Sequence, residues 1–267
     1  TPKGESLKLE VAEKVKFDFS GRVITAHPRK PLLYVSATGG DPGKVPGAVI
    51  FLNKDGSYQK HQNINFNDGA CYLSLDIENR HILGVSYGNG RLNVYPLDDL
   101  GIPGKTVTTI DEGKKEAHCV LLPPDGKNVY IPYVKGNLAI LQYAYDGNTG
   151  KVTPLKPKEA KPPLGSGPRH MAYHPTLPMV YFSNEQGIGL STYRREANGQ
   201  LKVEQDISIL PPGMSKIGLS ASDLLITPDG KFLYAGLRGH RQDFSRISRY
   251  RVLEDGKAEF LGLTEAD

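Results

Sequence analysis

Residues 167–186 read GPRHMAYHPTLPMVYFSNEQ, and this stretch decides the fold. Two short apolar runs flank a turn at residues 174–178 that carries two prolines. Such runs around a proline-rich turn predict a β-hairpin. Because the strands of a hairpin are antiparallel, Arg169 before the first run and Glu185 after the second should lie at the same edge of one sheet.

A weaker form of this stretch recurs along the chain. In four copies, a proline is followed six residues later by a tyrosine within a β-rich run, and a fifth copy is degenerate. The five starting positions, which we call anchors, are Pro28, Glu78, Pro124, Pro175 and Pro228, spaced 50, 46, 51 and 53 residues apart. A fixed period of this size is typical of repeat architectures.

Each unit continues with a second pair of strand-like runs. Turn dipeptides mark the tip of this second hairpin, for example Asp55-Gly56, Asn198-Gly199 and Asp255-Gly256. Four short strands in every unit predict an all-β protein, a β-propeller built from four-stranded antiparallel blades.

The number of blades is less clear from the sequence. Five full units are visible, and the stretch at residues 7–17 is interpreted as the outer strand of a preceding blade, which gives about five and a half. A propeller must close its ring or leave two sheet edges exposed. Two alternatives are open: a five-bladed ring with a strand left over, or a single propeller domain over residues 1–267 that lacks one or two blades. We favour the second.

Composition limits the class of protein. The 267 residues are 38% hydrophobic and 23% charged, with a net charge of +4, as in ordinary soluble proteins. We expect no membrane span and no nucleic-acid partner, and the mild positive charge favours small anionic ligands. The absence of a visible signal peptide slightly favours the cytoplasm, but the chain begins at Thr1 and a removed leader stays open. The sequence makes no prediction of the oligomeric state.

Two cysteines and several histidines are expected to be structural. Cys71 and Cys119 lie in apolar runs and form no CxxC pair, so they are interpreted as buried free thiols, with a disulfide as the open alternative. His27 and His174 each precede a proline in a turn and are interpreted as structural. Because side chains alternate along a strand, His170 should point away from Arg169 and contribute packing or secondary contacts.

The repeat register places certain side chains at one rim of the propeller. The position six before each anchor begins the innermost strand of a blade, and the position ten after it ends the second strand. The hairpin geometry brings both positions to the same rim, near the central channel. The first set is Arg22, Tyr72, His118, Arg169 and Ser222. The second set is Thr38, Gly88, Val134, Glu185 and Arg238.

Acid/base and anion-binding groups from three successive blades are therefore expected to lie close together at one end of the central channel. An imidazole or carboxylate there could act as a general acid or base, and two guanidinium groups could hold an anion and stabilise developing negative charge. Structural alternatives are an ion pair between Arg169 and Glu185 and a core position for His118. The candidate catalytic residues are His118, Glu185, Arg169 and Arg238. The candidate substrate-binding residues are Arg22, Tyr72, His170 and His240.

Other enzyme motifs are missing from the sequence. There is no HExxH, no phosphate-binding loop and no dinucleotide fingerprint, and residues 218–222 lack the closing glycine of a serine-nucleophile elbow. The rim positions do not supply the acidic and amide ligands of a calcium site. We therefore expect neither a metal nor a cofactor.

Three stretches, GPRHMAYHPTLPMVYFSNE, ITPDGKFLYAGLRGH and AHCVLLPPDGKNVYIP, resemble the lactonase-type seven-bladed propeller family. That family includes the propeller 6-phosphogluconolactonases and the fungal-type 3-carboxy-cis,cis-muconate lactonizing enzyme. The resemblance implies seven blades. For the muconate enzyme it also implies a catalytic His, Glu and two Arg, which fall on the four candidate catalytic residues named above.

The first hypothesis for function is hydrolysis of an anionic sugar lactone, such as 6-phosphogluconolactone, to its hydroxy acid without a cofactor. In this hypothesis Glu185 or His118 activates water, while Arg169 and Arg238 hold the anion and the developing oxyanion. One alternative is a muconate-type lactonizing cycloisomerase. The other is a non-catalytic propeller that binds a small anion or a protein partner.

Overall fold

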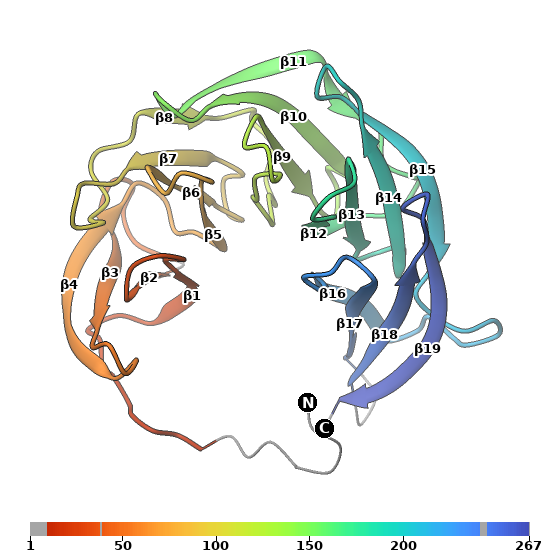
Figure 1. Ribbon diagram of the computed structural model, residues 1–267, viewed down its shortest axis with the longest axis horizontal. Helices are drawn as coiled ribbons and strands as arrows, with labels where there is room; N and C mark the ends of the chain where they lie inside the picture. Colours follow the sequence, from red (N-terminus) through yellow and green to blue (C-terminus); the bar gives the residue numbers. More distant parts are fainter. Residues whose placement is uncertain (1–9, 38, 241–244, 267) are drawn as a thin grey trace.

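The computed structural model describes residues 10–37, 39–240 and 245–266, and it confirms the all-β propeller fold (Figure 1). Five antiparallel sheets follow one another along the chain and are arranged around a common centre. Within the described ranges there is no helix long and apolar enough to cross a membrane.

Each sheet is one blade, and its strands pair in sequence order. The first blade contains β1 (Gly21–Ala26), β2 (Leu32–Ala37), β3 (Val45–Leu52) and β4 (Tyr58–Phe66). The second contains β5 (Tyr72–Leu75), β6 (His81–Val85), β7 (Leu92–Pro96) and β8 (Thr108–Ile110). The third contains β9 (Asn128–Tyr133), β10 (Ala139–Asp146) and β11 (Lys151–Ala160). The fourth contains β12 (Pro168–Tyr173), β13 (Met179–Asn184), β14 (Gly189–Arg195) and β15 (Leu201–Ser208). The fifth contains β16 (Leu219–Ile226), β17 (Phe232–Gly239), β18 (Ser245–Val252) and β19 (Ala258–Ala266).

The hairpin predicted from residues 167–186 is the β12–β13 pair. His174 closes its turn, because the imidazole Nδ1 accepts hydrogen bonds from the backbone N–H groups of Thr176 (3.2 Å) and Leu177 (2.9 Å). His27 closes the turn of the first blade in the same way. Both histidines are therefore structural, as predicted.

The third blade departs from the four-strand pattern. Its innermost segment, residues 117–121, pairs with β9 only through isolated bridges, Ala117 to Tyr133 and Leu121 to Tyr130. Pro132 lies between the two partners on β9 and has no N–H group to donate, so a regular ladder cannot form there. The segment is nevertheless held beside β9, because the His118 N–H donates to the Pro132 carbonyl oxygen at 3.0 Å.

Apolar side chains pack between successive blades. Four buried clusters fill the four interfaces, from the first blade against the second to the fourth against the fifth. A blade inside the arc therefore buries both of its faces, and all six residues of β13 are buried. Strands that are buried on both faces read as continuous apolar runs, which explains why MVYFS lacks the alternation of a surface strand.

The repeated tyrosine links three of the blades to the next blade. In the first, third and fourth blades its fully buried side chain donates a hydrogen bond to the carbonyl oxygen of a glycine in the following blade. The pairs are Tyr34 with Gly101 (2.9 Å), Tyr130 with Gly199 (2.5 Å) and Tyr181 with Gly256 (2.8 Å). In the fifth blade the equivalent Tyr234 is 37% exposed and has no hydrogen-bond partner among the described residues.

This contrast gives a test of the inter-blade bond. We expect Tyr181→Phe to lower the free energy of unfolding by about 1 kcal/mol, because the Gly256 carbonyl oxygen loses the hydrogen bond that the tyrosine hydroxyl donates to it. Tyr234→Phe removes the same hydroxyl at the same repeat position without breaking a bond, so it should change stability by only a few tenths of a kcal/mol. Urea denaturation of both variants measures the difference, and equal losses would show that the bond does not hold the blades together.

The arc of blades is open between the first and the fifth (Figure 1). The structure does not form the closed five-bladed ring that was one of the two alternatives. On the fifth blade, Leu225, Phe232, Tyr234 and Ile247 are 64%, 36%, 37% and 36% exposed, unlike their buried counterparts inside the arc. The face of the fifth blade that no neighbour covers therefore exposes these apolar side chains together with Arg249 and Arg251, the cross-strand partners of Tyr234 and Phe232.

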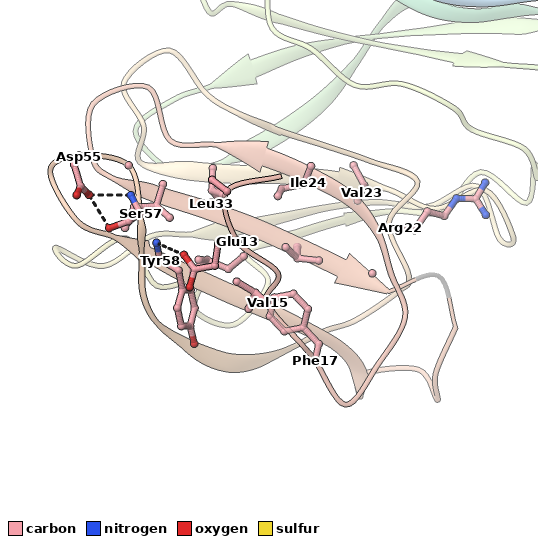
Figure 2. Close-up of a pocket in the computed structure, with 16 residues that line it drawn as sticks. Glu13, Val15, Phe17, Arg22, Val23, Ile24, Leu33, Asp55, Ser57 and Tyr58 are labelled. Carbon is pink, nitrogen blue, oxygen red and sulfur yellow. Dashed lines mark hydrogen bonds between the residues drawn. The ribbon is translucent and has the colours of Figure 1, made fainter. Parts of the chain in front are cut away.

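The expectation of an additional outer strand near the N-terminus is wrong for residues 10–17, which have no regular strand, while residues 7–9 lie outside the described ranges. This segment runs instead over the uncovered face of the first blade (Figure 2), where the Tyr58 N–H donates to Glu13 Oε2 at 3.1 Å. A strand needs a neighbouring strand to satisfy its backbone groups, and no blade lies beside this segment to supply one.

Both cysteines are free thiols, as predicted, and the alternative disulfide is not formed. Cys119 is fully buried between the third and fourth blades, and Cys71 is partly buried near it. Burial raises the pKa of each thiol to about 12, so both stay protonated at neutral pH.

Candidate functional site

The innermost strands carry β-bulges at the rim positions that the repeat singled out. The pairing register shifts between Gly21 and Val23 in β1, between Pro168 and His170 in β12, and between Ala221 and Leu224 in β16. A bulge inserts an extra residue and turns the side chains beside it in a new direction. The residues affected include Arg22, Arg169 and Asp223.

Two arginines and one carboxylate form the first part of the site. Arg238, near the end of β17, donates through Nη2 to Glu185 Oε1 and to the Ala221 carbonyl oxygen (3.3 Å). Arg169 at the start of β12 lies with its Nε 3.9 Å from Glu185 Oε2, beyond hydrogen-bond distance. Glu185 is thus bound firmly to Arg238 and only loosely paired with Arg169, so the predicted ion pair within the β12–β13 hairpin is weak.

Two histidines form the second part. His170 Nε2 lies 3.1 Å from Arg169 Nη1 and 3.2 Å from His118 Nδ1. The four predicted catalytic residues are therefore connected through His170. We call the connected set the rim cluster: His118, Arg169, His170, Glu185, Asp223 and Arg238.

His170 differs from the sequence expectation. Strict alternation placed its side chain on the opposite side of the strand from Arg169, but the two side chains are in contact. The bulge between Pro168 and His170 breaks the alternation and explains the error.

Asp223 was missed by the sequence reasoning. Its Oδ1 accepts a hydrogen bond from His170 Nδ1 at 2.7 Å. The repeat carries a signal that would have found it: Asp223 lies five residues before its anchor, the same position that His170 holds in the fourth blade. Ser222, the residue predicted for the rim, lies instead against β17, where a Cβ on Gly236 would come within 2.4 Å of the serine Oγ.

The electrostatic setting keeps both imidazoles neutral at neutral pH. Burial, reinforced by Arg169 and His170, lowers the pKa of His118 to about 3. Burial also lowers the pKa of His170, although the Asp223 carboxylate opposes that shift. The hydrogen bond from His170 lowers the pKa of Asp223, which is therefore ionised. The site combines uncharged imidazoles with charged guanidinium and carboxylate groups.

Three aromatic and cationic side chains surround the histidines. The Tyr72 ring meets His170 edge-on with ring centres 5.4 Å apart, and the Tyr87 ring meets His118 at 5.7 Å. Lys135 Nζ lies 5.3 Å from the centre of the Tyr87 ring. Burial raises the pKa of Tyr72, so its hydroxyl remains protonated. Tyr72 thus lies beside the rim cluster, and its role in substrate binding stays a prediction.

Other predicted rim residues contribute less. His240 Nε2 lies 2.7 Å from Ser220 Oγ, and the described residues give it no contact with the rim cluster. Arg22 lies at the start of β1, and its side chain points away from the other labelled groove residues (Figure 2); its charge, like that of Arg169, acts on Cys71, but the described residues give it no hydrogen bond with the rim cluster. Val134 is buried, and Thr38 lies outside the described residues.

A central cavity adjoins the rim cluster. It has a volume of about 440 Å³ and is lined by inner-strand residues of all five blades, including Tyr72, Met171 and Asp223. Ligand pockets in propellers and other closed sheets commonly lie on such an axis. Asp223 therefore connects the cavity to the histidines of the rim cluster.

A larger groove of about 840 Å³ lies over the uncovered face of the first blade (Figure 2). Its walls are mainly apolar, and its two carboxylates are already bonded, Glu13 to the Tyr58 N–H and Asp55 to the N–H and hydroxyl of Ser57. Because no histidine lines it and these charges are satisfied, the groove offers no acid/base chemistry. The rim cluster is the better candidate site despite its smaller cavity.

In the described part of the chain, no group of three or more His, Cys, Asp or Glu side chains is arranged to hold a metal ion. That the protein needs no metal and no cofactor stays a prediction.

Comparison with known proteins adds the family. The lactonase family, described as a 7-bladed β-propeller, matches residues 3–267. The 6-phosphogluconolactonase of Cronobacter sakazakii is 30% identical over 258 residues, which cover 96% of this chain and 72% of the relative. That of Klebsiella pneumoniae is 32% identical over 186 residues, which cover 69% of this chain but only 54% of the relative.

Solved structures agree on the fold. The periplasmic gluconolactonase of Pseudomonas aeruginosa superposes with a TM-score of 0.76 at 21% identity, covering 90% of this chain and 71% of its own. A putative 6-phosphogluconolactonase of Bacteroides fragilis gives a TM-score of 0.72 at 20% identity, covering 91% of this chain and 70% of its own. With its repeated four-stranded blades and a family match over nearly its whole length, the chain belongs to the lactonase family of seven-bladed β-propellers.

Proposed function

We propose that the rim cluster hydrolyses an anionic sugar lactone such as 6-phosphogluconolactone. The observation that carries this proposal is a buried, neutral His118 held in one connected cluster with Arg169 and Arg238. In that arrangement the His118 imidazole is unprotonated at neutral pH and can accept a proton. The two guanidinium groups can bind the negative charge of the substrate. The relatives named 6-phosphogluconolactonase support the same choice of substrate.

The reaction needs one base and one oxyanion-stabilising group. His118 Nε2 removes a proton from water as the water oxygen attacks the carbonyl carbon of the lactone. The carbonyl electron pair moves to its oxygen, where the Arg169 guanidinium stabilises the negative charge. When the tetrahedral intermediate collapses, the ring C–O bond breaks and the leaving ring oxygen takes the proton back from His118. One water is consumed and one hydroxy acid is released.

His118 suits the role of base better than Glu185 does. One oxygen of Glu185 accepts the Arg238 hydrogen bond, and the other faces Arg169 at 3.9 Å. Both carboxylate oxygens of Glu185 thus face guanidinium groups, whereas His118 Nε2 has no hydrogen-bond partner among the described residues. Glu185 is better placed to orient Arg238.

Positive charge near the site favours an anionic substrate. The arginines Arg169 and Arg238 face Glu185, and Lys135 stands nearby over Tyr87. The Arg238 side chain is 36% exposed, so it can reach a phosphate in solvent, whereas Arg169 is only 13% exposed. Arg238 is therefore proposed to hold the substrate phosphate and Arg169 the reacting carbonyl oxygen.

The lactonizing cycloisomerase is less favoured by the protonation states. That reaction must deliver a proton to carbon, which requires a protonated acid. The low pKa of His118 leaves it without the second proton of an imidazolium at neutral pH. The non-catalytic alternative shares the same anion-binding groups, so only a rate measurement separates it from the proposal.

Initial rates on two matched lactones test the proposal. We expect the protein to accelerate opening of 6-phosphogluconolactone above the spontaneous rate, and to open unphosphorylated gluconolactone with a higher KM. Arg238→Ala should raise KM for the phosphorylated lactone by roughly 10- to 100-fold, the loss of one charge-assisted hydrogen bond. It should affect the unphosphorylated lactone much less.

Arg251→Ala is the matched control, because Arg251 is an exposed arginine of the same blade that pairs with Glu259. If neither lactone opens faster than in the protein-free blank, the hydrolase proposal fails. Saturable binding of 6-phosphogluconate without turnover would then favour the anion-binding alternative.

A further inference from the structure

Three titratable side chains form a line from the central cavity into the rim cluster. Asp223 Oδ1 lies 2.7 Å from His170 Nδ1, and His170 Nε2 lies 3.2 Å from His118 Nδ1. The three residues come from different blades: Asp223 from β16, His170 from β12, and His118 from the segment beside β9. The line therefore crosses two blade interfaces.

Arg169 fixes where the protons are on this line. A guanidinium group only donates hydrogen bonds, so His170 Nε2, 3.1 Å from Arg169 Nη1, must be an acceptor and carry no proton. The remaining proton of a neutral His170 is then on Nδ1, where it is donated to the Asp223 carboxylate. The contact to His118 must therefore be donated by His118 Nδ1, because His170 Nε2 has no proton to give, and the single Nε2 lone pair is shared between His118 and Arg169.

These proton positions determine the state of His118 Nε2, the ring nitrogen that does not contact His170. With its single proton on Nδ1, a neutral His118 has an unprotonated Nε2, and none of the described residues forms a hydrogen bond with that atom. A doubly protonated His170 would place an N–H group against the Arg169 guanidinium, two donors facing each other, so this alternative conflicts with the observed contact.

We propose that Asp223 is a positioning residue that, through His170, holds His118 in the tautomer with its proton on Nδ1 and its Nε2 lone pair free. The tautomer is the less favoured one for a free histidine side chain, so it must be imposed by these partners. The catalytic consequence, a base aimed at water, rests on the proposed function. The tautomer assignment itself does not.

Nitrogen NMR of histidine side chains tests the tautomers without any substrate. In protein labelled with ¹⁵N-histidine, we expect the His118 and His170 rings both to show a protonated Nδ1 and an unprotonated Nε2. His118→Gln and His170→Gln each remove one set of signals and so assign them. A proton on His118 Nε2, or a doubly protonated His170, would overturn the proposal.

The variant Asp223→Ala tests the cause. Without the carboxylate, only Arg169 still favours an unprotonated His170 Nε2, so the His170 proton is expected to be shared between Nδ1 and Nε2, and part of the His118 population should then carry its proton on Nε2. Asp223→Asn should give a mixture, because an amide can donate as well as accept. Asp229→Ala is the control, since that exposed carboxylate of the same blade contacts Thr227 and Lys231 and not His170. Unchanged tautomers in both Asp223 variants would contradict the proposal.

Kinetics provides the second readout. Asp223→Ala should lower kcat for lactone opening by at least about tenfold, since a misdirected base loses part of the roughly 10²–10⁴ that general base catalysis supplies. KM should change little, because Asp223 is not proposed to bind the phosphate. If Asp223→Ala does not fold, the native spectrum and Asp223→Asn decide the question.

The two readouts separate the two proposals. The expected tautomers in a protein without lactonase activity would keep the positioning role and refute the proposed function. Lactonase activity in a protein whose His118 carries its proton on Nε2 would keep the function and refute the positioning role.

Discussion

Arg169→Ala is expected to lower kcat/KM for 6-phosphogluconolactone by about 10²–10³, mainly through kcat. The Arg169 side chain is 13% exposed, and its nearest carboxylate oxygen lies 3.9 Å away. Burial, together with the repulsion of Arg238, lowers its pKa, which indicates a charge that the protein compensates incompletely. Such a charge interacts more strongly with an oxyanion that forms during the reaction than with the neutral carbonyl of the substrate.

The control for this prediction is Arg194→Ala, which removes an arginine of the same blade that pairs with Glu204 on the neighbouring strand. Steady-state kinetics with subtraction of spontaneous opening provides both constants. A kcat that is unchanged in Arg169→Ala, with a well-folded variant, would mean that Arg169 does not contact the reacting centre. A rise in KM alone would move Arg169 to a role in ground-state binding.

His118→Gln is expected to lower kcat by about 10², the lower end of the usual contribution of a general base, because an imidazole whose pKa is lowered to about 3 is a weak base. Glutamine retains a polar side chain of similar length but has no nitrogen that can take a proton at neutral pH. His61→Gln is the matched control, because His61 lies on the outer strand β4 and its ring contacts Tyr58 and Phe17. Equal activity in His118→Gln and the native protein would remove His118 from the mechanism.

The pH profile of the native enzyme gives this prediction a second measurement. Burial, reinforced by Arg169, His170 and Arg238, which face His118 from the fourth and fifth blades, lowers the pKa of His118 to about 3. His118 should therefore stay unprotonated well below pH 6.5, so the acid limb of kcat/KM that belongs to it should lie far below the value of an ordinary histidine. An acid limb near 6.5 that disappears in His118→Gln would contradict the assigned environment.

The same pKa shift affects stability. In the unfolded chain His118 takes up a proton as the pH falls through about 6.5, whereas in the folded protein it does so only near 3. Between these values the unfolded state binds more protons, so the contribution of His118 favours unfolding increasingly as the pH falls. His118→Gln should flatten this part of the stability curve, as measured by denaturant unfolding at several pH values.

The fold was predictable because the repeated residues have structural roles, in hydrogen bonds between blades and in the packing between them. In the first, third and fourth blades the tyrosine six residues after an anchor donates its hydrogen bond to the next blade, and the apolar runs fill the interfaces between blades. The same register located His118, Arg169, Glu185 and Arg238, and the structure connects all four. Their catalytic roles stay predictions that the variants above test.

The errors also have local causes. His170 was misplaced because a bulge changes the direction of side chains without leaving a periodic mark in the sequence. Asp223, which holds the same repeat position in the fifth blade, was missed with it. In the third blade, Pro132 breaks the ladder of the innermost strand, although the repeat predicts a full one. A register argument is thus accurate over whole blades and weak within one or two residues of a bulge or proline.

The most direct test compares the native protein with the double variant Arg169→Ala/His118→Gln on 6-phosphogluconolactone, with a protein-free blank for spontaneous opening. The double variant Arg251→Ala/His61→Gln, which changes the same residue types away from the rim cluster, is the control. The account predicts native-like turnover in the control and opening close to the blank rate in the rim variant. Turnover by the rim variant at the native rate would contradict the claim that the rim cluster is the active site.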